Sequence, residues 1–354
     1  MKNIATYPPL KIVMHSPFHE FASWEELEKI RLTLLELGRC WQESIYLPTW
    51  GVSIGVQMLK DVNISANTLF GASIVLATLA SWRRLKEVYR FAPELEEILY
   101  GQADDCRIPV GILHGLPYSC FYIETPNLCG RKFHGFFVFM DQNMEKTMFI
   151  LRCLGISSDS SIIKNYDLKL TEETTLEDAV KSNFAEELMN AMTGEKNFTV
   201  NDIRQEIEER KFIISRLLQV ILYICAQNSD ISESKKGRTG IPRNTAVVKD
   251  KYREIRTWDV GYRIVNIIKR DVKTEPQHED VEESDRERPC GMTSRKSPRP
   301  HMRKSHWHIY WVGKRNQAER KMVIKWIHST LINGKSVDEL PVTINQYKQE
   351  NPFN

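Results

Sequence analysis

The sequence predicts an α+β protein in which long helices pack against an antiparallel sheet, with a basic, His- and Trp-rich β-hairpin near the C-terminus. Three patterns indicate this class. Apolar residues repeat at helical spacing in two early segments, 24–41 and 67–89. Short β-type runs with small gaps follow between 108 and 170, and residues 307–327 contain two segments that alternate in the manner of strands.

The first helix is marked by a capping box, in which Ser23 is followed three positions later by Glu26. Leu27, Ile30 and Leu34 then repeat at the spacing of one helix face. Two glycines, at 51 and 55, are expected to interrupt this pattern.

The second helix overlaps an uncharged run from 62 to 82. The strongly apolar part of this run, 69–80, is too short to cross a hydrocarbon layer of ~30 Å. We therefore expect a helix buried in the core and no membrane association.

The middle of the chain changes to strand patterns separated by turn residues. The short gaps between them favour an antiparallel meander. Candidate strands cover 108–113, 120–124, 135–140, 148–154 and 162–170. Helical patterns return at 176–192 and 202–227, and the apolar second half of the latter is expected to pack on the sheet.

These patterns suggest a division into an α+β body, a polar linker or mobile loop, a C-terminal β element and a tail. The expected boundaries are 1–228 for the body, 229–256 for the linker, 257–333 for the β element and 334–354 for the tail. The β element divides into a strand at 257–268, a disordered charged excursion at 271–299 and a basic hairpin at 300–328.

Composition excludes several classes. With 354 residues, 42% of them hydrophobic and 27% charged, the chain is not collagen-like, wholly disordered or a disulfide scaffold. Its seven cysteines are odd in number and form no Cys-x-x-Cys pair, which indicates reduced thiols in a cytoplasmic protein.

The charge is distributed unevenly. Residues 286–325 carry twelve Lys or Arg against two Glu, a net charge of +10 in a chain whose total is +3. The remainder of the chain is therefore at −7. Basic segments of this kind usually bind phosphate groups or an acidic protein surface.

The basic segment is also rich in histidine and aromatic residues, so it is the candidate nucleic-acid or ribosome contact: cations bind phosphate and rings stack on unpaired bases. The contact residues are Arg299, His301, Arg303, Lys304, His306, His308, Tyr310, Lys314 and Arg315. Trp307, Trp311 and Trp326 are expected to form a small aromatic core.

Other interpretations of this segment remain open. His301, His306 and His308 could act as acid and base in metal-free phosphodiester cleavage. The same histidines could bind a metal, but no carboxylate lies among them and nearby cations oppose it, so neither a metal nor a cofactor is expected. The simplest alternative is a basic hairpin in which His and Tyr only satisfy hydrogen bonds at the edge.

The tail of the chain carries a long motif, Pro300-His301-x-Arg303-x-x-His306-Trp307-His308-x-Tyr310-Trp311-x-Gly313. It resembles the C-terminal signature of the type V-A anti-CRISPR family, in the group around that family's second member. Further blocks match the family in the same order along the chain: Trp82-Arg83, Tyr89, Leu116-Pro117, Tyr122, Gly135-Phe136, Asp141, Val260-Gly261-x-Arg263, Trp326 and Asn333. The resemblance thus runs from about residue 70 to 333.

The resemblance implies a protein of a phage or mobile element that suppresses synthesis of a type V-A CRISPR effector nuclease in the bacterial cytoplasm. It would recognise the effector's nascent N-terminal polypeptide on the translating ribosome, and the effector mRNA would be lost. Lys304-Ser305 replaces the family's usual Arg-Gly. The alternative is a ribonuclease or RNA-binding protein of a mobile element that acts on another target.

Overall fold

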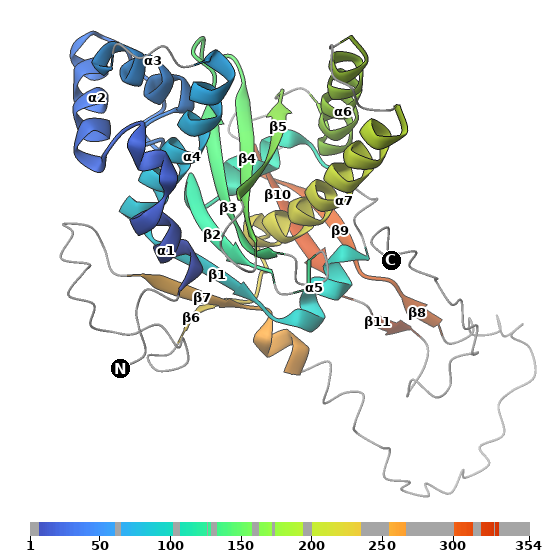
Figure 1. Ribbon diagram of the computed structural model, residues 1–354. Helices are drawn as coiled ribbons and strands as arrows, with labels where there is room; N and C mark the ends of the chain where they lie inside the picture. The colour runs from blue at the N-terminus through green and yellow to red at the C-terminus, as the bar shows by residue number, and fades with distance from the viewer. Residues whose placement is uncertain are drawn as a thin grey trace, which may run out of the picture.

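The computed structural model describes twelve stretches of the chain, and the predicted excursion 271–299 and tail 334–354 lie outside them. The described residues are 7–60, 65–101, 107–125, 127–128, 133–157, 163–171, 174–193, 200–234, 255–266, 301–313, 320–328 and 330–332. They form a central sheet between two groups of helices, with a separate hairpin against one group (Figure 1). This arrangement confirms the α+β class.

The N-terminal part is helical. Its elements are α1 (Pro8–His15), η2 (Pro17–Glu20), α2 (Trp24–Glu36), α3 (Thr49–Leu59) and α4 (Ala66–Leu85). The capping box of α2 is confirmed, because Ser23 N donates to the Glu26 carboxylate at 2.7 Å and Glu26 N donates to Ser23 Oγ at 3.3 Å. The glycines at 51 and 55 do not interrupt the helical region as expected: they lie inside α3, where Gly55 allows close contact with Ile30 of α2.

Helix α4 is the buried core helix that the sequence predicts. Its hydroxyl residues are tolerated inside because Ser73 Oγ and Thr78 Oγ1 donate to carbonyls four residues earlier, those of Leu69 and Ile74. The helix ends earlier than expected, since Lys86 adopts a left-handed φ of 53° and the chain enters a strand at once. Within the described residues, no helix is both long and apolar enough to span a membrane.

The central sheet has seven strands in the order β5-β4-β3-β2-β1-β7-β6. Its strands are β1 (Glu87–Phe91), β2 (Cys120–Glu124), β3 (Phe133–Gln142), β4 (Phe149–Ser157), β5 (Ile163–Leu170), β6 (Ile231–Glu233) and β7 (Arg256–Val260). The meander from β2 to β5 is antiparallel, as predicted. Strand β1 was not predicted, and it pairs in parallel with both β2 and β7.

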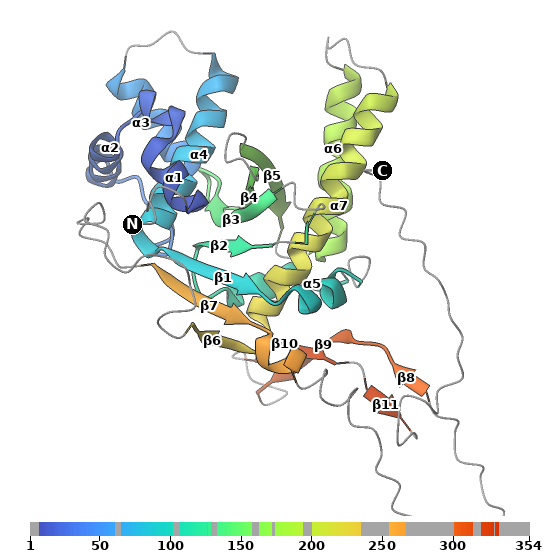
Figure 2. The same cartoon turned by 60° about the horizontal axis from the view of Figure 1, so that its bottom comes forward.

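Side chains alternate between the two faces of the sheet and build two cores. Val88 and Tyr122 belong to the core with α1–α4, whereas Tyr89 and Ile123 belong to the core with α5 (Pro93–Tyr100) and α7 (Val200–Cys225). Figure 2 shows the two helix groups on opposite sides of the sheet.

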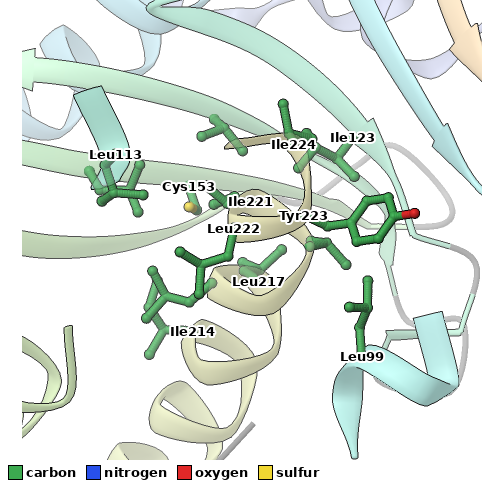
Figure 3. Packing of buried hydrophobic residues seen from close by; sticks show 14 of the residues in the cluster. Leu99, Leu113, Ile123, Cys153, Ile214, Leu217, Ile221, Leu222, Tyr223 and Ile224 are labelled. Atoms are coloured by element: carbon green, nitrogen blue, oxygen red, sulfur yellow. The ribbon is translucent and has the colours of Figure 1, made fainter. Parts of the chain in front are cut away.

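The predicted packing of α7 on the sheet is confirmed. Its apolar C-terminal half places Ile221 beside Cys153 of the sheet, and Leu217 belongs to the same core (Figure 3). The remaining helix, α6 (Leu176–Thr193), lies next to α7.

Three local predictions need correction. The strand expected at 108–113 is wrong: the chain there leads into a 3-10 helix, η3 (Val110–Gly115). The strand expected at 257–268 ends at Val260, because Gly261 takes a positive φ of 80° and residues 262–266 turn into a helix. Part of the segment expected to be a linker forms β6, which pairs with β7.

Candidate functional site

The C-terminal hairpin is formed by β9 (His306–Val312) and β10 (Lys321–Ile327), which pair in antiparallel register. Two further short strands, β8 (His301–Arg303) and β11 (Thr330–Ile332), pair with each other beside it. Register and alternation define two faces. The inner face carries the pairs Trp307–Trp326, Ile309–Ile324 and Trp311–Met322, and the outer face carries His306–Ile327, His308–Lys325, Tyr310–Val323 and Val312–Lys321.

The inner face attaches the hairpin to the end of α7. Trp307 and Trp326 have ring centroids 4.5 Å apart in an edge-to-face arrangement, and Trp326 is fully buried. The Trp307 indole N–H donates to Gln219 Oε1 of α7 at 2.7 Å. Asn228 bonds both backbone groups of Trp326, at 2.8 and 2.9 Å. The hairpin is therefore held by side-chain packing and by hydrogen bonds along the edge of β10.

The expectation for the third tryptophan is wrong. Trp307 and Trp326 lie in the core, but Trp311 is 55% exposed. Trp311 is on the inner face, but it lies near the turn, four residues beyond Trp307, which packs against α7. The Arg320 guanidinium covers its ring at 5.3 Å from the centroid.

The outer face presents stacked rings and cations. His308 and Tyr310 stack with centroids 4.1 Å apart and planes inclined by 29°. Lys325 Nζ lies 5.3 Å from the centroid of the Tyr310 ring. Both Tyr310 and His308 are exposed. A flat aromatic surface with an ammonium group beside it is suited to stacking and anion binding together.

A second group of polar side chains lies where β8 leads into β9. Arg303 Nη2 is 3.3 Å from His306 Nε2, and His306 Nδ1 is 3.1 Å from the Lys304 carbonyl oxygen. Arg303 and Lys304 are exposed, whereas Ser305 between them and the strand is buried. The backbone thus turns inward at Ser305 and leaves the basic side chains outside.

The charged side chains in the described part of the hairpin are all cationic. Residues 301–313 and 320–328 contain no Asp or Glu. Their cations are Arg303, Lys304, Arg320, Lys321 and Lys325. Of these, Arg320, Lys321 and Lys325 are not among the predicted contact residues. Only the register of β10 on β9 places Lys321 opposite Val312, and only the fold places Arg320 and Lys325 beside Trp311 and Tyr310.

Several predicted site residues cannot be placed. Arg299, Lys314 and Arg315 lie outside the described residues, and for His301 only the backbone in β8 is described. His306 and His308 share the outer face. In the described part of the chain, no group of three or more His, Cys, Asp or Glu residues is placed to hold a metal ion.

A separate polar cluster ties the N-terminal segment to the carboxyl ends of β1 and β2. Tyr7 donates to Glu124 at 2.7 Å, and Arg90 Nε lies 3.3 Å from the other oxygen of that carboxylate. Tyr122 is hydrogen bonded to His134 Nδ1 at 2.9 Å, and burial lowers the pKa of this histidine below its ordinary value. Single-sequence patterns do not indicate this cluster, since its members come from segments far apart in the chain.

The fold and the hairpin define a class: an α+β protein whose acidic body carries a basic, aromatic C-terminal hairpin. The AcrVA2-like family, described as the anti-CRISPR type V subtype A2 family, matches residues 89–334. The chain belongs to this family and is thus a type V-A anti-CRISPR protein.

The structural comparison agrees with the family assignment. A crystal structure of AcrVA2 superposes with a TM-score of 0.55 at 16% sequence identity, covering 92% of this chain and 99% of that one. At this identity the likeness shows a shared fold. No curated protein matches the chain.

Proposed function

We propose that this protein suppresses synthesis of a type V-A CRISPR effector nuclease in the bacterial cytoplasm. It recognises the N-terminal polypeptide of the effector during translation, and the effector mRNA is then lost. Membership of the type V subtype A2 anti-CRISPR family carries the proposal. The matched region includes most of the sheet, α7 and the hairpin, so it covers the hairpin together with the helix that holds it.

The charge distribution supports separate roles for the body and the hairpin. Outside residues 286–325 the chain has a net charge of −7, which opposes contact with RNA. We assign recognition of the polypeptide to this acidic body. The basic hairpin then faces the mRNA or the ribosome.

Co-expression with a type V-A effector tests the proposal, with effector mRNA and protein as the measurements. Both should fall. Two altered effector genes separate the signals: one with synonymous codons at its start, and one with a compensated frameshift that keeps the RNA nearly unchanged but alters the peptide. Suppression should survive the first change and disappear with the second. Unchanged mRNA and protein with the unaltered gene would reject the proposal.

A second candidate function, metal-independent RNA cleavage, is supported by one observation: His306 lies 3.3 Å from Arg303, on the same face as His308. An imidazole and a cation placed together could transfer a proton and stabilise a charged phosphate intermediate. Incubating purified protein with labelled RNA, with and without chelator, tests it. Cleavage that His306→Gln abolishes would favour this function, and intact RNA in both conditions would exclude it.

A further inference from the structure

We propose that the outer face of the β9–β10 hairpin binds single-stranded RNA, with bases stacked on the His308–Tyr310 ring pair and phosphates held by Lys325 and its neighbouring cations. This inference deepens the proposed function, since it names the partner of the hairpin. It does not depend on which polypeptide the body recognises.

The ring pair is positioned by the fold and remains accessible. Tyr310 is 37% exposed, although its strand is anchored to α7 through Trp307, which lies three residues earlier on the opposite face. His308 stacks on it at a centroid distance of 4.1 Å. A preformed aromatic platform on a rigid strand loses little conformational entropy when a base stacks on it.

The cations lie beside the ring pair. If an RNA base stacked on these rings, the phosphate backbone of the RNA would pass close to them. Lys325 pairs across the strands with His308, and its Nζ is 5.3 Å from the Tyr310 centroid. Lys321 pairs with Val312 further along the same face. Since residues 301–313 and 320–328 contain no carboxylate side chain, this surface complements a polyanion.

The aromatic surface favours a nucleic acid with unpaired bases over the other polyanions, and the mRNA of the proposed function is such a strand. An acidic protein would use the cations but would not need exposed, stacked rings. A duplex hides its base faces, and the major groove of A-form RNA does not admit side chains. On the opposite face, near the turn, the Trp311 ring is also exposed, at 55%, with Arg320 beside it.

Fluorescence anisotropy with the purified full-length protein tests the inference. The probe is a labelled single-stranded RNA of about 12 nucleotides, within the ~4–16 nucleotides that comparable surfaces bind. Tyr310→Ala should weaken binding about fivefold or more, whereas Tyr310→Phe, which keeps the ring, should bind like the wild type. Lys325→Gln should reduce the slope of log affinity against log salt by about 0.7.

Matched controls come from the other end of the molecule. Phe70→Ala removes an exposed ring from α4, and Lys29→Gln removes an exposed cation from α2. Both should leave affinity and salt slope unchanged. Thermal unfolding checks that each variant folds.

Three results would overturn the inference: no RNA binding, duplex bound as tightly as single strand, or Tyr310→Ala binding like the wild type. These outcomes are distinct from failure of the proposed function. RNA binding without suppression of the effector would reject the proposed function alone. Suppression without RNA binding would reject the hairpin assignment alone.

Discussion

The indole N–H of Trp307 in β9 donates to the side-chain oxygen of Gln219 in α7 at 2.7 Å, and both side chains are buried. This bond joins residues 88 positions apart and fixes the hairpin on the body. Because strand residues alternate, fixing Trp307 inward also fixes His306 and His308 outward. The packing of the inner face therefore fixes which side chains the outer face presents.

The first prediction compares the three tryptophans of the hairpin. Trp326→Ala should lower the free energy of unfolding by roughly 3–5 kcal/mol, because the ring is fully buried. Trp307→Phe, which loses the bond to Gln219, should cost about 1–3 kcal/mol. Trp311→Ala should change stability by less than about 0.5 kcal/mol, since that ring is mostly exposed. Urea unfolding measures all three, and a large loss for Trp311→Ala would contradict the structure.

The hairpin shows how far single-sequence patterns reach. Alternation in 307–327 predicts both strands and the outward position of His308 and Tyr310, because these depend only on local periodicity. Whether Trp311 is buried or exposed depends on how far α7 covers the inner face of the hairpin. That is a property of the tertiary structure, which local periodicity does not contain. The same limit explains why Arg320 and Lys325 were missed.

The sheet shows a second limit. The β2–β5 meander is local in sequence and was predicted, whereas β1 is short and directly follows a helix with similar apolar content. Its partner β7 lies more than 160 residues away. Parallel pairing over such a distance leaves no periodic signal. The strand expected at 108–113 failed because a short apolar run does not separate strand from 3-10 helix.

The second prediction concerns the buried carboxylate of Asp141. It accepts a hydrogen bond from Arg152 Nε at 2.7 Å and another from Thr49 N, at the start of α3, at 3.3 Å. Asp141→Ala should destabilise by roughly 3–5 kcal/mol, because the buried Arg152 cation loses a partner. Chemical denaturation measures it. The control is Glu177→Ala, which breaks the exposed pair with Lys181 and should leave the midpoint unchanged.

The third prediction concerns two glycines. A Cβ at Gly135 would lie 2.3 Å from the Ile123 carbonyl oxygen and 2.5 Å from the Tyr122 hydroxyl. Gly135→Ala should therefore destabilise by about 1–3 kcal/mol or more. Gly71 lies within α4 with open space around it, so Gly71→Ala should stabilise by roughly 0.5–1 kcal/mol. Equal effects on the melting temperature would contradict this contrast.

The fourth prediction is a pH dependence that arises at Glu96. Burial raises the pKa of this carboxyl to about 8. The folded state therefore retains a proton that the unfolded state loses near its ordinary value of about 4.3, and stability should fall by up to about 1.4 kcal/mol per pH unit between these values.

The variant Glu96→Gln isolates this effect. Gln is similar in size and does not ionise, so the stability of the variant relative to the wild type should increase steadily from pH 5 to pH 8 and then level off. Urea unfolding at each pH gives the difference. Parallel stability curves for the two proteins would show that Glu96 does not titrate in this range.

The fifth prediction concerns Arg303, which is exposed and lies 3.3 Å from His306. Because its side chain is not buried, Arg303→Ala should leave unfolding unchanged while it impairs suppression of the effector. Arg303→Lys should restore the activity only in part, since lysine keeps the charge but cannot form two parallel hydrogen bonds to a phosphate. Effector mRNA in co-expressing cells measures the activity, with Lys29→Gln as the charge-matched control. If Arg303→Ala suppresses the effector fully, the corner between β8 and β9 makes no functional contact, and only the ring pair and Lys325 remain as the RNA-binding part of the hairpin.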